Sequence, residues 1–389
     1  MDIHSIRKDT KGCTDKVFLN SAGSSLVPDV VTAQMIEYLK QEAIIGGYAL
    51  AYQSGDVLNE FYTEAALLLN CQPANIAFVS SATDAYAKAI SSVRFKAGDV
   101  ILTTDDDYIS NYMAFMSLSE RFGVKVVRGT NLPDGDLDLA DFERLVQLHQ
   151  PKLIALTHIP TSSGLVQPAE EVGKICRKYD ILYLLDACQS VGQITVDVKK
   201  IDCDFLSATG RKFLRGPRGT GFLYVSDRVL QTDLVPLIFD MQGAKWTGID
   251  TYEILPSAQR FEYWENSCAG KIGLTEALKY VNKVGIGAIE TYNAGLMQTF
   301  RVQLAQVNGV QLQDKGTRLS SILTFTIKDK TQPEISQLLW DHDIYHSISF
   351  RDFALIDFTK KNIDRAIRLS PHYFNTAEEL EKVCAVLAS

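Results

Sequence analysis

The sequence predicts an α/β protein with a mostly parallel seven-stranded sheet in a large domain and a smaller α+β C-terminal domain. Between residues 76 and 225, short apolar runs alternate with longer amphipathic stretches, as in β-α-β units around a buried parallel sheet. Near residue 270 this alternation ends, and long helical segments with short strands follow. The length of 389 residues is typical of two domains, and a content of 46% hydrophobic and 22% charged residues is usual for globular proteins.

Apolar runs of four or five residues predict the strands of the large sheet, and amphipathic stretches predict the helices between them. The predicted strands are 76–79, 100–103, 124–127, 153–157, 182–185, 204–207 and 222–225. A helix is expected over 28–45, where Val31, Met35 and Leu39 are spaced by four residues, and another over 168–178.

The C-terminal part is predicted to contain helices at 272–284, 289–307 and 376–387, with short strands at 319–327 and 346–350. Thr376, followed by Glu379 three residues later, is typical of a capping box at the start of the last helix. We expect a large cofactor-binding domain over residues 15–260 and a small α+β domain over 1–14 and 261–389. No low-complexity linker separates them, which favours rigid packing.

Charge and cysteine content exclude several classes of protein. The chain has 39 Lys and Arg against 47 Asp and Glu, a net charge of −8, and no basic run, so nucleic acid is not an expected partner. The N-terminus lacks the apolar core of a signal peptide, and no stretch is long enough to span a membrane. Seven scattered cysteines without a Cys-x-x-Cys pair are typical of reduced thiols. We therefore expect a cytoplasmic protein without a metal site.

An acidic residue, Asp186, ends the apolar run 182–185. An acid at the carboxyl end of a buried parallel strand faces the crevice where such sheets bind ligands, and a buried carboxylate favours a cationic partner. The alternative is an ordinary helix N-cap.

A single lysine, Lys212, lies in the glycine-rich stretch 207–221, between Thr209, Arg211 and Arg215. This stretch precedes a strand, whereas a dinucleotide fingerprint follows one, and no P-loop spacing is present. Neighbouring cations lower the pKa of an amine, as a Schiff-base lysine requires. A solvated basic loop is the alternative.

Small and hydroxyl residues at 80–85 directly follow the predicted strand 76–79. At a helix N-terminus they would present free backbone N–H groups to a phosphate, although a simple N-cap explains them equally well. A phosphate seat, a buried acid for a pyridinium nitrogen and a lysine for an imine together indicate pyridoxal phosphate.

On these motifs the chain resembles the class V aminotransferases, the fold type I pyridoxal-phosphate enzymes that include the cysteine desulfurases. The resemblance extends from 20–25 to 368–372. It implies that Lys212 forms the Schiff base, Asp186 pairs with the ring nitrogen and Arg368 binds the substrate carboxylate. The other positions implied to bind the cofactor are Ala82, Thr83, Tyr108, Gln189, Thr209 and Arg211, with Tyr108 stacking on the ring and Gln189 bonding its phenolic oxygen.

Two stretches depart from the family pattern. The segment 347–355 has no cysteine, although desulfurases carry a persulfide-forming cysteine there, so desulfuration through a protein persulfide is not expected. The segment 260–266 lacks the Gly-Thr that lends a phosphate contact across the dimer, although the family resemblance still implies a homodimer. Arg211 also stands where the family commonly has His.

The motifs at 45–48, 211–219 and 260–265 are most similar to the hercynylcysteine sulfoxide lyases and, more distantly, to the isopenicillin epimerases. The resemblance implies an enzyme that acts on an amino acid through an imine with the cofactor and an α-carbanion. We expect a carbon–sulfur lyase that eliminates from a cysteine or cysteine sulfoxide substrate. Transamination and epimerisation remain open, as does a cofactor-free binding protein of the same fold.

Three further groups of residues could form sites. His342 and His346 are four residues apart but have no third ligand nearby. Three consecutive acids at 105–107 are typical of a solvated turn, and the alternative is a site that binds Mg²⁺. Core packing is expected for four aromatic residues, with a substrate pocket as the alternative, and Tyr48 is a candidate substrate-binding residue. The four are Tyr48, Tyr52, Trp246 and Trp264.

Overall fold

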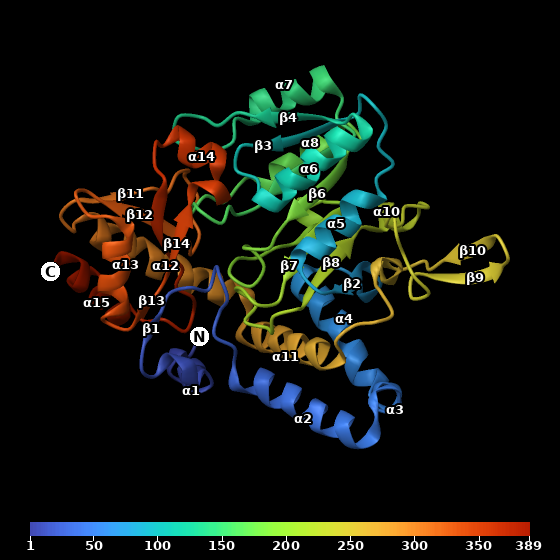
Figure 1. The fold of residues 1–389 in the computed structure, drawn as a ribbon, viewed down its shortest axis with the longest axis horizontal. Coiled ribbons are helices and arrows are strands. Elements are labelled where there is room, and N and C mark those ends of the chain that lie inside the picture. The colour runs from blue at the N-terminus through green and yellow to red at the C-terminus, as the bar shows by residue number, and fades with distance from the viewer.

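A seven-stranded sheet with helices on both faces forms the centre of the computed structural model, which describes residues 1–389 (Figure 1). The strand order is β2-β8-β7-β6-β5-β3-β4; β8 runs antiparallel to both of its neighbours, and all the other pairs are parallel. The strands are β2 (Ile76–Val79), β3 (Val100–Thr104), β4 (Lys125–Gly129), β5 (Leu153–Thr157), β6 (Leu182–Asp186), β7 (Phe205–Thr209) and β8 (Gly221–Val225). The predicted fold class is confirmed, and every strand predicted for this sheet is present with its ends within two residues.

Successive side chains of the central strands enter two different cores, because residues of a strand alternate between the faces of a sheet. Leu153 and Phe205 pack with α5 (Ala82–Ser92) and α6 (Ile109–Phe122). Ile154 and Leu206 belong to the larger core on the other face, with side chains of several further helices. These helices include α4 (Gly55–Leu69), α7 (Leu139–His149), α8 (Ala169–Lys178) and α11 (Cys268–Val284).

A second, antiparallel sheet of order β11-β12-β15-β14 lies at the C-terminal end of the chain and has its own core (Figure 1). Its strands are β11 (Val310–Leu312), β12 (Leu323–Ile327), β14 (Ser347–Phe350) and β15 (Arg365–Leu369). The helices of this part are α12 (Ile286–Ala305), α13 (Gln332–Trp340), α14 (Leu355–Lys360) and α15 (Ala377–Ala388). The predicted strand 319–327 begins only at Leu323, because Leu319 instead forms an isolated bridge with Leu165. The capping box of Thr376 and Glu379 is confirmed.

The N-terminal segment joins the two parts. In α1 (Ile3–Lys8), Arg7 forms an ion pair of 2.7 Å with Glu379 of α15, and β1 (Val17–Phe18) pairs with β13 (Ile344–Tyr345). Helix α2 (Asp29–Ile45) runs beside α11 at the bottom of Figure 1 and leads into α3 (Gly47–Gln53). The domain boundaries at residues 15 and 260 stay a prediction.

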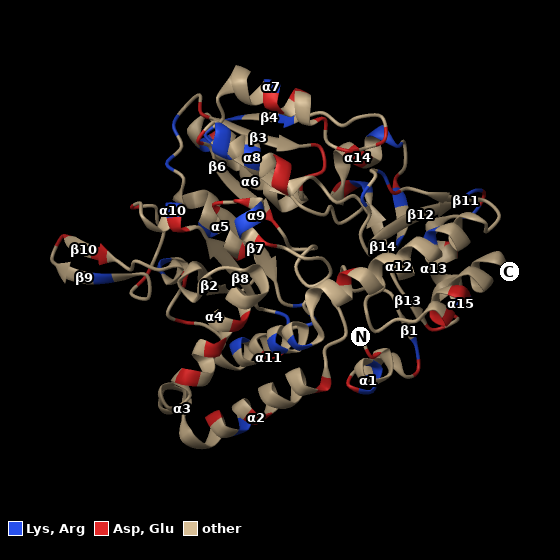
Figure 2. Ribbon diagram, turned by 180° about the vertical axis from the view of Figure 1, so that it is seen from behind, with Lys and Arg blue, Asp and Glu red and all other residues tan.

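The remaining elements are α9 (Val198–Ile201), α10 (Asp227–Leu230) and a hairpin of β9 (Ala244–Gly248) and β10 (Thr251–Ile254). The hairpin projects from the molecule at the right of Figure 1 and was not predicted. Its side chains are almost all exposed, so it has no buried face that would produce an alternating pattern. Acidic and basic residues are interspersed over the fold (Figure 2), and none of the helices has the length and apolarity that crossing a membrane requires.

Candidate active site

A hollow of about 570 Å³, partly open to solvent, lies at the carboxyl ends of β5, β6 and β7 and the N-terminal end of α5. Ligands of open α/β sheets bind in this position. The structure brings together in this hollow all eight residues that the resemblance assigns to the cofactor. The lining residues are Ser81, Ala82, Thr83, Tyr108, Asn111, Thr157, Ile159, Thr161, Asp186, Cys188, Gln189, Thr209, Arg211 and Lys212.

The buried carboxylate of Asp186 is held by two hydrogen bonds. Oδ1 accepts from the backbone N–H of Cys188 at 2.9 Å, and Oδ2 accepts from Asn111 Nδ2 at 3.0 Å. Burial raises the pKa of Asp186, while these two donors and the positive charge of Lys212 counteract the rise. No ion pair reaches Asp186 within the protein, so the expected cationic partner would come from a ligand.

Asn111 in turn is fixed by Asp107, whose Oδ1 accepts from Asn111 Nδ2 at 2.8 Å. Asp107 also accepts hydrogen bonds from Thr103 at 2.5 Å and Thr157 at 2.6 Å, and from the backbone N–H of Tyr108 at 2.8 Å. A chain of hydrogen bonds thus runs from the end of β3 to the carboxylate at the end of β6. It fixes the amide of Asn111 with its N–H groups toward the two acids.

Lys212 is buried in the hollow, and burial is the main reason that its pKa is lowered. Among its charged neighbours, Arg211 and Arg368 lower this pKa further, while Cys188 and Asp186 oppose them. A lysine amine in this setting releases its proton more readily and is a better nucleophile toward an aldehyde. Neither Lys212 nor the two arginines form an ion pair with a carboxylate, so this region favours bound anions.

The N-terminus of α5 faces the same hollow. Ser81 caps the helix by accepting a hydrogen bond from Asp84 N at 3.1 Å, and the N–H groups of Ala82 and Thr83 have no acceptor within the protein. Free N–H groups and the positive end of the helix dipole form a seat for a phosphate.

Thr161, which lines the hollow, is the shared partner of Arg368 and Gln189. Arg368, on β15, donates from Nη1 to the Oγ1 of Thr161 at 2.8 Å and from Nη2 to Asn20 Oδ1 at 3.3 Å. Burial, followed by the nearby charge of Arg211, lowers the pKa of Arg368 to about 10. Gln189 also donates to Thr161 Oγ1, at 3.1 Å, while its buried Oε1 has no partner.

The core packing expected for four aromatic residues was wrong, because their side chains are at least half exposed, whereas the role of Tyr48 in substrate binding stays a prediction. Tyr48 is 80% exposed on α3 and lies outside the hollow, and Tyr52, Trp246 and Trp264 are 91%, 78% and 50% exposed.

The acids 105–107 do not form the expected solvated turn. Asp106 and Asp107 are buried, and Asp105 and Asp106 pair with lysines of the C-terminal part. His346 bonds with Ser336 and the backbone of Ile344, and it shares no ligand cluster with His342.

Several residues of the hollow were not predicted, notably Asn111, Thr157, Thr161 and Cys188. Thr157 and Cys188 flank predicted positions at strand ends, so the strand assignment alone could have indicated them. Asn111 lies in the first turn of α6, beyond the end of the predicted strand, and gives no such signal.

Comparison with known proteins assigns the chain to a family. A sequence model described as "Aminotransferase class-V" matches residues 17–383. The chain belongs to the class-V aminotransferase family. Similar to it are the proteins named "Probable cysteine desulfurase" in Methanothermobacter thermautotrophicus and in Pyrococcus abyssi. Each is 28% identical, with 98% of this chain and 96% of the relative covered.

Solved structures agree with this class-V fold. The apo cysteine desulfurase of Thermococcus onnurineus NA1 matches with a TM-score of 0.92 and 25% identity, covering 100% of this chain and 98% of that one. The cystine C–S lyase C-DES, in complex with cysteine persulfide, matches in fold with a TM-score of 0.86 at 21% identity, covering 97% and 99%.

Class-V enzymes use pyridoxal phosphate, and the residues of the hollow fit this group. The free N–H groups of Ala82 and Thr83 suit its phosphate, and the unpaired carboxylate of Asp186 suits its ring nitrogen. Lys212 is the amine of the hollow and suits its aldehyde. The unpartnered Oε1 of Gln189 is a buried polar atom of the kind that a ligand site leaves unsatisfied.

Proposed function

We propose that this class-V enzyme is a carbon–sulfur lyase that releases a sulfur group from Cβ of a cysteine-type amino acid. The observation that carries the proposal is the convergence of Lys212, Arg211 and Asp186 in one hollow. Arg368 is bonded to Thr161, which lines this hollow, and its charge acts on Lys212. The curated relatives named cysteine desulfurase support the choice of sulfur chemistry.

Each charged residue has a distinct role in the proposed reaction. Pyridoxal phosphate, when bound, supplies an electron sink for the negative charge that develops at Cα. Asp186, held as an anion by the Cys188 N–H and Asn111, keeps a proton on the ring nitrogen. Lys212, whose burial favours the neutral amine, takes the proton from Cα. Arg368 binds the substrate carboxylate and orients Cα toward Lys212.

The cysteines of the chain favour release of the sulfur group as a small molecule. The loop of β14 and the following residues 351–355 contains no thiol, and Cys188 is the one cysteine that lines the hollow. Burial raises the pKa of Cys188, and a protonated thiol is a poor nucleophile toward sulfur. We therefore propose elimination followed by formation of pyruvate and ammonia, without a persulfide on the protein.

The reaction type is tested by assaying pyruvate from cysteine, cystine and cysteine sulfoxides with the holoenzyme and no added keto acid. Pyruvate formation is expected with at least one of them and should be lost in Lys212→Ala, which also loses the visible band of the imine near 400–430 nm. Amino transfer that requires a keto acid, or exchange at Cα with inversion and no pyruvate, would replace the lyase by an aminotransferase or an epimerase. A protein that stays colourless on reconstitution would overturn the cofactor assignment.

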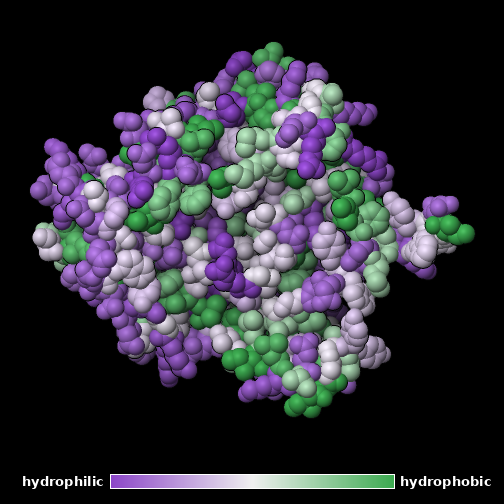
Figure 3. Space-filling view, viewed as in Figure 1, coloured by the Kyte–Doolittle hydropathy of each residue, from purple (hydrophilic) through white to green (hydrophobic).

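We also propose that the enzyme is a homodimer that uses the exposed apolar side chains of α2 and α3. Apolar residues gather there at the bottom of Figure 3, and patches of this kind on a soluble fold mark contact sites. The exposed residues include Ile36, Leu39, Ile44, Tyr48 and Tyr52. Light scattering on the wild type and on Ile44→Lys tests this, since a dimer should dissociate in the variant and a wild-type monomer would contradict the proposal.

A further inference from the structure

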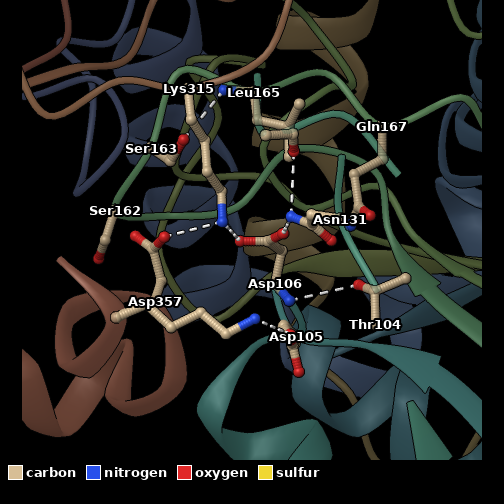
Figure 4. A network of polar contacts seen from close by, with 12 residues as sticks. Thr104, Asp105, Asp106, Asn131, Ser162, Ser163, Leu165, Gln167, Lys315 and Asp357 are labelled. Carbon is tan, nitrogen blue, oxygen red and sulfur yellow. Dashed lines mark hydrogen bonds and ion pairs between the residues drawn. The ribbon is translucent and has the colours of Figure 1, made fainter. Parts of the chain in front are cut away.

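Opposite charges from distant parts of the chain meet in a cluster beside the active site (Figure 4). Lys315 Nζ lies 2.5 Å from Asp106 Oδ1 and 2.7 Å from Asp357 Oδ1. The second oxygen of Asp106 accepts from Asn131 at 2.8 Å, and the second oxygen of Asp357 pairs with Lys361 at 2.8 Å. We call Asp106, Lys315, Asp357 and Lys361 the charge cluster.

The cluster is withdrawn from solvent. The side chains of Asp106, Asp357 and Lys315 are 1%, 8% and 14% exposed. Burial by itself would lower the pKa of Lys315, but the two carboxylates outweigh it and raise that pKa, so the lysine remains charged. Without this ammonium, two carboxylates would face each other in a poorly hydrated space, which is strongly unfavourable.

The cluster joins the turn after β3 to α14. Asp106 precedes Asp107 and Tyr108, which belong to the active-site network, while Asp357 lies in the first turn of α14. The short loop 351–354 lies directly before α14. Lys315 itself comes from the segment between β11 and β12, so one side chain connects three segments that are distant in sequence.

The loop 351–354 forms one wall of a small hollow next to the active site. Phe353, Ala354 and Asp107 line this hollow, and Tyr108 and Thr161 line both hollows. Thr161 is also the partner of Arg368, the proposed carboxylate-binding residue. A substrate side chain that extends away from Arg368 along Thr161 would therefore meet Phe353 and Ala354.

We propose that Lys315 is a positioning residue that holds the loop 351–354 against the Tyr108 turn, so that Phe353 and Ala354 form the wall that contacts the substrate side chain. The proposal rests on the proposed function for the identity of that substrate, but the placement of the loop is independent of it. Lys315 touches neither hollow and acts only through the two carboxylates.

The test compares Lys315→Met with the wild type and with Lys360→Met. Lys360, at the end of α14, pairs with Asp105 at 2.5 Å, but its side chain is 58% exposed, so loss of this pair should have little effect. Hydrogen exchange of the holoenzyme is measured for peptides covering 350–361, and KM and kcat are measured for the best amino-acid substrate. In Lys315→Met we expect roughly tenfold faster exchange in this segment alone and a KM about tenfold higher with kcat within about twofold.

A double variant separates loop placement from a general loss of stability. Asp106→Asn with Lys315→Met removes the repulsion that the single change creates, so exchange and KM should return toward the wild type. The proposal is overturned if Lys315→Met has the hydrogen exchange and the KM of the wild type. It is also overturned if exchange becomes faster throughout the protein and does not recover in the double variant. If no lyase activity is found at all, the exchange measurement still decides the role of Lys315.

Discussion

Replacement of Asn111 by Ala tests how the active site keeps its acid ionised. Asn111 Nδ2 supplies one of the two hydrogen bonds that hold Asp186, at 3.0 Å. A hydrogen bond to a charged group contributes about 1.5–3 kcal/mol, so its loss should lower kcat/KM by about 10- to 100-fold. Asp107 keeps its bonds from Thr103, Thr157 and the Tyr108 N–H, so the local fold should persist.

The pH dependence of this variant has a definite sign. Burial already raises the pKa of Asp186, and Asn111 counteracts the rise, so removal of the amide raises this pKa further. Activity that needs the ionised carboxylate of Asp186 is lost as the pH falls through its pKa. In the variant, the acidic limb of the pH profile of kcat/KM should therefore move to higher pH. Thr103→Val is the matched control, because it removes a bond to Asp107 only and should leave the limb in place. An acidic limb for Asn111→Ala that coincides with that of the wild type would refute the role assigned to Asn111.

Four further changes probe binding and stability. Arg368→Ala removes the guanidinium that is proposed to bind the substrate carboxylate, so KM should rise about 100-fold while the visible absorption band of the cofactor persists. Steady-state kinetics and absorption spectra measure these two quantities. Gly192→Ala should destabilise the fold by more than about 2 kcal/mol in urea denaturation, because Gly192 has φ +97° and a Cβ would lie 2.5 Å from the backbone of Phe213. Gly219→Ala, at φ +77° in open space, should cost only about 1 kcal/mol by the same measurement. Glu262→Ala removes a buried carboxylate and should cost about 3–5 kcal/mol, visible as a lower thermal midpoint; an unchanged midpoint would contradict this.

The central sheet could be predicted because each buried strand carries its apolar pattern within its own short stretch of sequence. All five positions of β5 and of β7 are buried, so the sequence shows uninterrupted apolar or small residues there. The site follows from this sheet, because Asp186 and Thr209 end strands and Lys212 comes shortly after one. The carboxyl ends of these parallel strands lie at one edge of the sheet, whatever conformation the loops adopt.

Other features depend on partners that are far away in the sequence. Asp106 was expected in a solvated turn, and nothing near it indicates that Lys315 and Asp357 would bury it. Asn111 resembles any polar residue of an amphipathic helix until Asp107 and Asp186 are placed beside it. The side chains of the β9–β10 hairpin are almost all exposed, and a pattern that reflects burial cannot reveal it.

The antiparallel strand β8 has a consequence for the order in which the enzyme matures on the ribosome. Strand β2, which leads into the α5 terminus, has β8 as its only neighbour in the sheet, and Ile76 pairs with Tyr224. During synthesis β2 leaves the ribosomal exit tunnel early but cannot pair until β8 emerges. Strand β8 emerges only after Lys212 has been incorporated into the chain. The nascent chain should therefore bind pyridoxal phosphate only once more than half of the polypeptide has been translated. Truncated products that end before residue 221 should be unable to bind it.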